Sequence, residues 1–451
     1  MKYLAALFFL TFMLAACGGQ GYEADAPAAA ADKYVLNIAI FEGGYGRAFW
    51  LDAVARFEAA HPGVVVNMDI GIDIERIAPQ IARGEVPDFL SVEIVGIFEW
   101  MRDNRQLLPL NDFFNMTEAL DRPGVLLRDI FLPGVLTSPA LMPFRDGTLY
   151  FAPYHVGPTA LVYNRHLFDT MGWAVPTTWE DFFALDALLD DPATFVYIDG
   201  QPQRRYLFAY QGVHPGYLET LMWGTIASAG GAEAVQRIEN FEPGAWDNPE
   251  VRAALAILAR LGRYMMPNTT QLDHIQSQAY MMQGRALFIP CGAWMPQEML
   301  NHPREPGFTF GMAPVPALLP GGTRFVPGFS GRHAIARYGA NPDLALEFLR
   351  FLYTRESIEA FARLAGGLKA TTDAAHLAEP YLDPNVANMM YVFTNAEFIE
   401  FNWAPVPEAA GVIPRDEAFA HTMTPFMLGI LSIDDYIARQ EEAARLIRAA
   451  R

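Results

Sequence analysis

The chain has 451 residues, 52% of them hydrophobic and 13% aromatic, which is enough for two or more domains with their own cores and excludes a disordered protein. Its net charge at pH 7 is −19, from 32 Lys and Arg against 51 Asp and Glu, and the sequence has no basic cluster. Nucleic acid is therefore not expected as a partner, and the negative charge is explained by solubility.

The first 33 residues have the pattern of an export and anchoring segment. Leu4–Met13 is a largely apolar run, too short to span a bilayer. Leu14–Gly18 resembles a bacterial lipobox, which implies a lipoprotein signal peptide at 1–16, lipidation of Cys17 and a flexible tether over 17–33. The protein would then be lipid-anchored outside the cytoplasm, on the outer face of the cell or in the periplasm. An ordinary signal peptide with a chance cysteine is the alternative.

Strands and helices are predicted to alternate in the segment that follows. The expected strands are Tyr34–Phe41, Val64–Ile70 and 87–92, and the first helix is Arg47–Ala60. This alternation is typical of βαβ units and a parallel sheet.

The middle and end of the chain predict further elements. Two separate strands, Thr148–Tyr154 and Thr159–Asn164, are expected around a Gly-Pro crossover. Thr177 and Glu180, three residues apart, predict a capping box that opens a helix. The C-terminal third reads as mostly helical and ends in an amphipathic helix over Asp434–Ala450.

The stretch 279–299 predicts a helix, a glycine turn, a buried strand and a second helix. The strand Ala286–Ile289 is expected to end at Pro290, and Gly292 frees the backbone just before Trp294. The carboxyl end of a strand is where open α/β sheets hold their ligands, so the ring of Trp294 could stack on a sugar. The alternative is that Trp294 only anchors the core.

Patterns for catalysis and metal binding are absent from the sequence. There is no HExxH, no CxxC and no His pair at helical spacing, and the glycine loop 43–46 lacks the spacing of a phosphate cradle. A glycosidase would need two carboxylates at a set separation, and no motif marks such a pair. Cys291, the one cysteine after Cys17, reads as a packed small hydrophobe. The sequence therefore predicts no metal, no cofactor and no enzyme activity.

Several short motifs, taken in order, resemble those of the family 1 extracellular solute-binding proteins of ABC importers. They are Pro87-Asp88, Leu107–Leu110, Leu161–Asn164, Pro176–Phe182, Gly284–Ala286, Gly292–Trp294, Met312–Pro316 and Asn341–Phe351. The resemblance implies a monomeric, type II periplasmic-binding-protein-like clamp of the α/β class, with a mixed sheet flanked by helices in each lobe. A carbohydrate would bind between the lobes and be delivered to the importer's permease.

The resemblance also implies several hinge crossings, near Tyr154–Pro158, Phe325–Gly328 and Gly366–Ala370. Lobe one would comprise residues 34–155 plus 327–369, and lobe two would comprise 156–326 plus 370–451.

A narrower resemblance concerns the ligand. The segments His274–Gln278, Ile289–Trp294 with Glu298-Met299, and Phe241–Trp246 are similar to those of the N-acetylglucosamine/chitobiose-binding branch. N-acetylglucosamine or chitobiose is the implied ligand.

Sugar sites combine aromatic faces with planar polar groups. The expected aromatic residues are Trp294, Trp223, Tyr154, Phe329 and Trp403. The expected polar residues are Glu42 and Glu93 after two strands, His274 and Gln278 four apart on one helix, and Ser330 on the second hinge crossing. For each residue the alternative is packing or a solvated surface.

Other functions share these features. A binding protein for a peptide, a polyamine or another oligosaccharide has the same fold-level pattern. A secreted lipoprotein enzyme acting on glycosides and a structural or adhesion lipoprotein are the other two classes.

Overall fold

The computed structural model describes residues 34–451 except 72–76, 78, 81–82, 92–100, 103, 133–134, 391, 393–395, 401–405, 407–410 and 414–415. The predictions for 1–33, including Cys17, and those for Glu93 and Trp403 lie outside the described residues. Phe329 is described by its backbone only.

Lobe one begins with three parallel strands. β1 (Tyr34–Ile40) pairs with β2 (Val64–Ile70) and with β3 (Phe89–Ser91), as expected. Helix α1 (Ala48–Ala60) covers them, because Phe49, Ala53 and Phe57 recur every four residues and bury one face. The lobe is completed by α4 (Asn111–Met116), α11 (Pro342–Phe351), α12 (Arg355–Ala365), β11 (Leu368–Lys369), α13 (Ala374–Ala378) and the 3-10 turns Leu127–Ile130, Val135–Thr137 and Pro139–Leu141.

Lobe two is larger and surrounds a second core. Its strands are β5 (Val196–Ile198), β6 (Gln201–Gln203), β7 (Tyr206–Phe208), β8 (Ala286–Gly292), β9 (Phe310–Ala313) and β12 (Glu397–Glu400). Its helices are α5 (Arg165–Met171), α6 (Trp179–Ala184), α7 (Glu219–Glu239), α8 (Pro249–Leu261), α9 (His274–Met282), α10 (Met295–Glu298), α14 (Pro384–Met390), α15 (His421–Met427) and α16 (Ile433–Ala450). Short 3-10 turns lie at Leu185–Asp190, Pro192–Thr194, Pro215–Leu218, Gly262–Tyr264 and Thr269–Gln271, and a π turn at Asp416–Ala420. As expected, the C-terminal helix packs here, through Tyr436 and Ile447.

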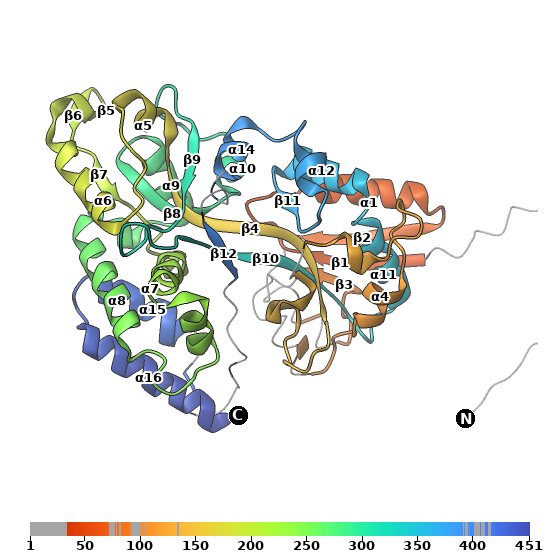
Figure 1. The fold of residues 1–451 in the computed structure, drawn as a ribbon. Coiled ribbons are helices and arrows are strands. Elements are labelled where there is room, and N and C mark those ends of the chain that lie inside the picture. The colour runs from red at the N-terminus through yellow and green to blue at the C-terminus, as the bar shows by residue number, and fades with distance from the viewer. Residues whose placement is uncertain are drawn as a thin grey trace, which may run out of the picture.

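Two long antiparallel strands join the lobes, β4 (Phe151–Asn164) and β10 (Phe325–Ile335) (Figure 1). The sheet order β2-β1-β3-β10-β4-β8-β7 runs from one lobe into the other. The expected break into two strands around Gly157-Pro158 is wrong. Gly157 pairs with Phe329, and the carbonyl of Pro158 accepts from Ala293 N at 3.1 Å. The strand therefore stays hydrogen-bonded on both sides of the position where proline has no N–H. β8 likewise continues through Pro290, which pairs with Leu161.

The capping box lies one residue later than predicted. Thr178 is the cap, accepting from Asp181 N at 3.1 Å while the Asp181 carboxylate accepts from Thr178 N at 3.0 Å. Trp179, fully buried, is the first helical residue. Threonines stand at both 177 and 178, and Asp181 completes the box, while the Glu180 carboxylate pairs with Arg260.

The last crossing between lobes also differs from the expectation. Residues 370–373 stay with lobe one, because Leu132 N donates to Ala370 O at 3.1 Å, Thr372 N donates to Ile130 O at 2.9 Å, and Asp373 pairs with Arg122 at 2.7 Å. The chain enters lobe two between α13 and α14. The buried cores draw on different parts of the chain, one on 36–154 and 334–370 and the other on 160–326 and 389–447. Among the described residues, no helix is both long and apolar enough to cross a membrane.

Each of the three hinge strands brings one basic side chain into a buried group, the hinge basic cluster: His155 of β4, His333 of β10 and Lys369 of β11. The Lys369 ammonium lies 4.0 Å from the ring centroid of Tyr154 and 4.6 Å from that of Phe49. Its Nζ has no hydrogen-bond partner among the described residues. Burial, then the charge of Arg56, holds the pKa of Lys369 well below its usual range.

Burial also lowers the pKa values of both histidines of the hinge basic cluster. Burial and, to a lesser degree, Lys369 lower the pKa of His155 to about 3. The pKa of His333 is well below its usual range because of burial, then Lys369 and His155. Burial therefore disfavours the protonated forms of these three groups in the folded hinge, where aromatic rings are their neighbours.

Replacing Lys369 by Met should stabilise the protein and flatten its pH dependence. Because the pKa of Lys369 is lower in the folded than in the unfolded chain, the unfolded chain binds more protons between the two values. Stability therefore rises with pH across this window and falls as the pH drops towards the folded pKa. We expect Lys369→Met to raise the urea unfolding free energy at pH 7 and to reduce its slope between pH 7 and about 10.

Arg83→Met is the matched control, because Arg83 is an exposed cation of lobe one and should leave the slope unchanged. A Lys369→Met protein less stable than wild type at pH 7, with the wild-type slope, would contradict the buried uncharged amine.

Candidate functional site

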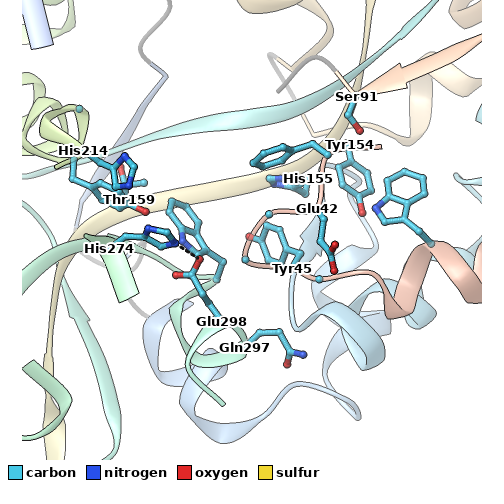
Figure 2. Close-up of a pocket in the computed structure, with 18 of the residues that line it drawn as sticks. Glu42, Tyr45, Ser91, Tyr154, His155, Thr159, His214, His274, Gln297 and Glu298 are labelled. Atoms are coloured by element: carbon cyan, nitrogen blue, oxygen red, sulfur yellow. Dashed lines mark ion pairs between the residues drawn. The ribbon is translucent and has the colours of Figure 1, made fainter. Parts of the chain in front are cut away.

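A cavity of about 860 Å³ lies between the lobes (Figure 2). Lobe one lines it with Phe41, Glu42, Gly43, Gly44, Tyr45, Gly46, Trp50, Ser91, Tyr154 and His155. Lobe two lines it with Thr159, His214, Gly216, Tyr217, Thr220, His274, Trp294, Gln297 and Glu298. Figure 2 shows the side chains of the two lobes facing each other across this cleft, with His155 and Thr159 contributed by β4.

Trp294 forms part of the lobe-two wall, directly before α10. A Cβ at Gly292 would lie 1.8 Å from Cζ3 of the indole, so only glycine leaves room for the ring over the end of β8. The indole also hydrogen-bonds the Tyr217 side chain, which lines the same wall. The glycine at 292 is thus required by close approach of the ring rather than by a positive φ.

Polar groups surround the tryptophan on the same wall. His274 Nε2 lies 4.0 Å from Glu298 Oε1, and the ring of His214 lies 5.2 Å from the ring of His274. The Glu298 side chain is 15% exposed. Asp273 caps α9 through a capping box with Gln276 and so fixes where His274 begins the helix. Trp294 and Glu298 are four residues apart and both line the cleft, so this wall offers a ring and a carboxylate together.

The lobe-one wall has a second carboxylate. Glu42 accepts from Nε of Arg47 at 2.6 Å and also pairs with Nη2 of the same guanidinium. The hydrogen bonds from Arg47 lower the pKa of Glu42 against a smaller desolvation effect, which keeps it an ionised acceptor at neutral pH. Tyr154 lines the same wall, and the centroid of its ring lies 5.2 Å from that of Trp50.

The structure brings four of the expected site residues to the cleft: Trp294, Tyr154, Glu42 and His274. Three others are buried elsewhere and do not line it. Trp223 is fully buried in the core of lobe two, where its ring centroid lies 6.1 Å from that of Trp246. Gln278 is fully buried on the inner face of α9. Ser330 is 6% exposed, and its N–H donates to Glu400. Phe329 pairs through its backbone with Gly157, and its side chain is outside the description.

Helical amphipathicity explains why Trp223 and Gln278 do not line the cleft. Both lie on helices next to the cleft, but a helix buries the face turned towards its own lobe, and these residues are on that face. Sequence reasoning missed Glu298, Tyr45, Trp50, Tyr217 and His214 as lining residues. For Glu298 a signal was available, its spacing of four from Trp294 after a glycine corner.

The chemistry of the lining limits what the cleft can hold. Among the described residues that line it, none is Lys or Arg, and two are carboxylates. Within the described part of the chain no group of His, Cys, Asp and Glu is arranged to hold a metal ion. Cys291 is buried behind the Trp294 wall, and burial raises the pKa of its thiol well above the usual range. The cleft is thus built for binding through ring faces and hydrogen bonds.

Solved structures of low sequence identity share the fold. A chitin oligosaccharide binding protein superposes with a TM-score of 0.70 at 17% identity, covering 93% of this chain and 100% of that one. The GacH receptor of Streptomyces glaucescens superposes with a TM-score of 0.68 at 18% identity, covering 92% and 98%. Both are substrate-binding clamps, so the expected two-lobed α/β clamp is confirmed.

Sequence relatives point to the same family. The diacetylchitobiose binding protein NgcE of Streptomyces coelicolor is 25% identical over 357 residues, 76% of this chain and 70% of the relative. A binding protein of Brucella abortus is 24% identical over 409 residues, 87% of this chain and 86% of the relative. The profile of the family described as bacterial extracellular solute-binding protein matches residues 52–388. Since this match spans most of the sequence, the chain belongs to the bacterial extracellular solute-binding proteins.

Proposed function

We propose that the protein captures a sugar or oligosaccharide in the interlobe cleft and delivers it to the permease of an ABC importer. The observation that carries the proposal is a cleft whose two walls combine aromatic rings with carboxylate, imidazole and amide groups. Its volume of about 860 Å³ lies in the range of about 300–1,000 Å³ common for small-molecule sites. The permease would distinguish the closed clamp from the open one.

The proposed ligand is N-acetylglucosamine or its disaccharide, diacetylchitobiose, which is called chitobiose in the screen below. The relative from Streptomyces coelicolor is named for binding diacetylchitobiose, and the match to it covers 76% of this chain. An uncharged amino-sugar derivative also suits the described part of the lining, which contains no Lys or Arg to pair with an anionic sugar.

The charges of the cleft make the alternatives weaker. A polyamine needs several uncompensated acids. Among the described residues that line the cleft, the carboxylates are Glu42, which is paired with Arg47, and Glu298, which lies 4.0 Å from His274. Hydrolysis of a glycoside needs a general acid with a raised pKa, and Glu42, whose pKa is lowered, does not supply it. Peptide binding stays an outcome of the ligand screen below.

The proposal includes a lipid anchor and a monomeric state. Leu14–Gly18 has the lipobox pattern, and lipidation of Cys17 would hold the clamp near its permease without a membrane-spanning helix. Ligand capture by a clamp needs only one chain, because both walls of the cleft come from the same protein.

A thermal-shift screen of the purified protein tests the ligand class. Its panel holds N-acetylglucosamine, chitobiose, maltose, xylobiose, glucose, spermidine and a peptide mixture. A ligand at 100 times its Kd adds about 2.7 kcal/mol, which should raise Tm by a few degrees. We expect the shift with N-acetylglucosamine or chitobiose; a shift with spermidine or peptides alone would overturn the sugar assignment.

Trp294→Ala should weaken sugar binding by about 1–3 kcal/mol, by analogy with the loss of an aromatic stacking platform from nucleobase sites. Isothermal titration calorimetry gives the change in Kd. Tyr197→Ala is the control, because Tyr197 is an aromatic residue of β5 that is 71% exposed and outside the cleft lining. Equal affinities of the folded Trp294→Ala protein and wild type would remove Trp294 from the site.

Cys17→Ser should release the protein from the membrane fraction of expressing bacteria, because the thiol that carries the lipid is lost. Fractionation followed by immunoblotting measures the distribution. If the variant partitions like the wild type, the anchor is not on Cys17.

A further inference from the structure

The indole of Trp294 is held between two glycines from different lobes. A Cβ on Gly44 of lobe one would lie 2.4 Å from Cδ1 and 2.9 Å from Cγ of the ring. At its other edge, a Cβ on Gly292 would lie 1.8 Å from Cζ3 and 2.1 Å from Cε3. Real Cβ atoms do not approach this closely, so the ring fills all the space between the two backbones.

Gly44 is a glycine because of this contact and not because of its backbone conformation. Its φ is not positive, unlike that of Gly46 two residues later. An alanine could therefore adopt the backbone of Gly44, but its methyl group would collide with the ring of Trp294. The ring cannot yield towards lobe two, because the backbone of Gly292 already blocks that side.

The loop that carries Gly44 is fastened to lobe one on both sides. Gly46 N donates to Gly43 O at 2.9 Å and closes the turn, while the pair Glu42–Arg47 ties its two ends. Beneath the turn, the ring of Tyr45 lies 4.6 Å from that of His155 and 5.4 Å from that of Phe361. The Tyr45 hydroxyl is buried, and this burial raises its pKa. Because the loop is fixed in this way, a force that displaces Gly44 acts on lobe one as a whole.

We propose that Trp294 and Gly44 form an interlobe latch, a direct contact between the lobes that sets how far the clamp closes, with Gly44 as a positioning residue for ligand capture. The inference rests on the proposed function, since closure matters only if a ligand is enclosed. Trp294 then has two roles, with its ring edges held by the latch and its remaining surface lining the cleft. A side chain larger than that of glycine at position 44 would clash with Trp294 and hold the lobes apart.

A double-mutant cycle with Gly44→Ala and Trp294→Ala tests the latch. In the wild-type background Gly44→Ala should weaken diacetylchitobiose binding about tenfold, or about 1.4 kcal/mol, because residues in direct contact couple energetically. In the Trp294→Ala background the same substitution should change Kd less than about twofold, because the clashing ring atoms are gone. Equal effects of Gly44→Ala in both backgrounds would overturn the latch.

Small-angle X-ray scattering of the ligand-free proteins gives a second readout that needs no sugar. Gly44→Ala should increase the radius of gyration, and Trp294→Ala should relieve the increase in the double variant. Gly216→Ala is the matched control for shape, because Gly216 also lines the cleft, has no positive φ and has open space where its Cβ would stand. Identical scattering of wild type and Gly44→Ala, together with unchanged binding, would refute the inference.

The outcomes separate the latch from the proposed function. If the wild type binds no sugar of the panel, the proposed function fails, and the scattering series alone decides the latch. If the wild type binds diacetylchitobiose and Gly44→Ala binds it equally well, the latch fails and the function stands. A Gly44→Ala protein with the wild-type Tm shows that its effects arise from closure rather than from loss of folding.

Discussion

Both lobes share one pair of antiparallel strands, β4 and β10, and the rest of the molecule is arranged around this shared ladder. β3 and β11 pair with these two strands in lobe one, and β8 and β9 pair with β4 in lobe two. A backbone ladder resists shear within a lobe, and β4 passes unbroken through Gly157-Pro158 from one lobe into the other. The cleft lies beside this point, with His155 and Thr159 on either side of it.

Basic and aromatic side chains pack together around the ladder at the hinge. The hinge basic cluster is buried among the rings of Tyr154, Phe49 and Phe361. Burial favours the neutral forms of these groups. The hinge strands are therefore held by backbone hydrogen bonds and aromatic packing, and the nearby cleft lining carries carboxylates but no Lys or Arg among its described residues.

Local sequence patterns predicted local structure well where a single interaction decides it. The amphipathic pattern over Asp434–Ala450 predicted α16 to within one residue at its start, because the face that a helix buries is set by its own sequence. The capping box lies one residue away from its prediction, because two threonines stand side by side at 177 and 178 and Asp181 rather than Glu180 completes the box.

The sequence by itself determined the family, the alternation of strands and helices in lobe one and the presence of a tryptophan at the end of β8, because short motifs and apolar periodicity are local properties. Only the tertiary structure decided which side chains meet in the cleft. Tyr154, Glu42, His274 and Trp294 converge there from four separate segments, whereas Trp223 turns into the core of its own lobe. It also decided that Gly44 faces Trp294 across the cleft, since 250 residues separate them and nothing local to either position specifies the contact.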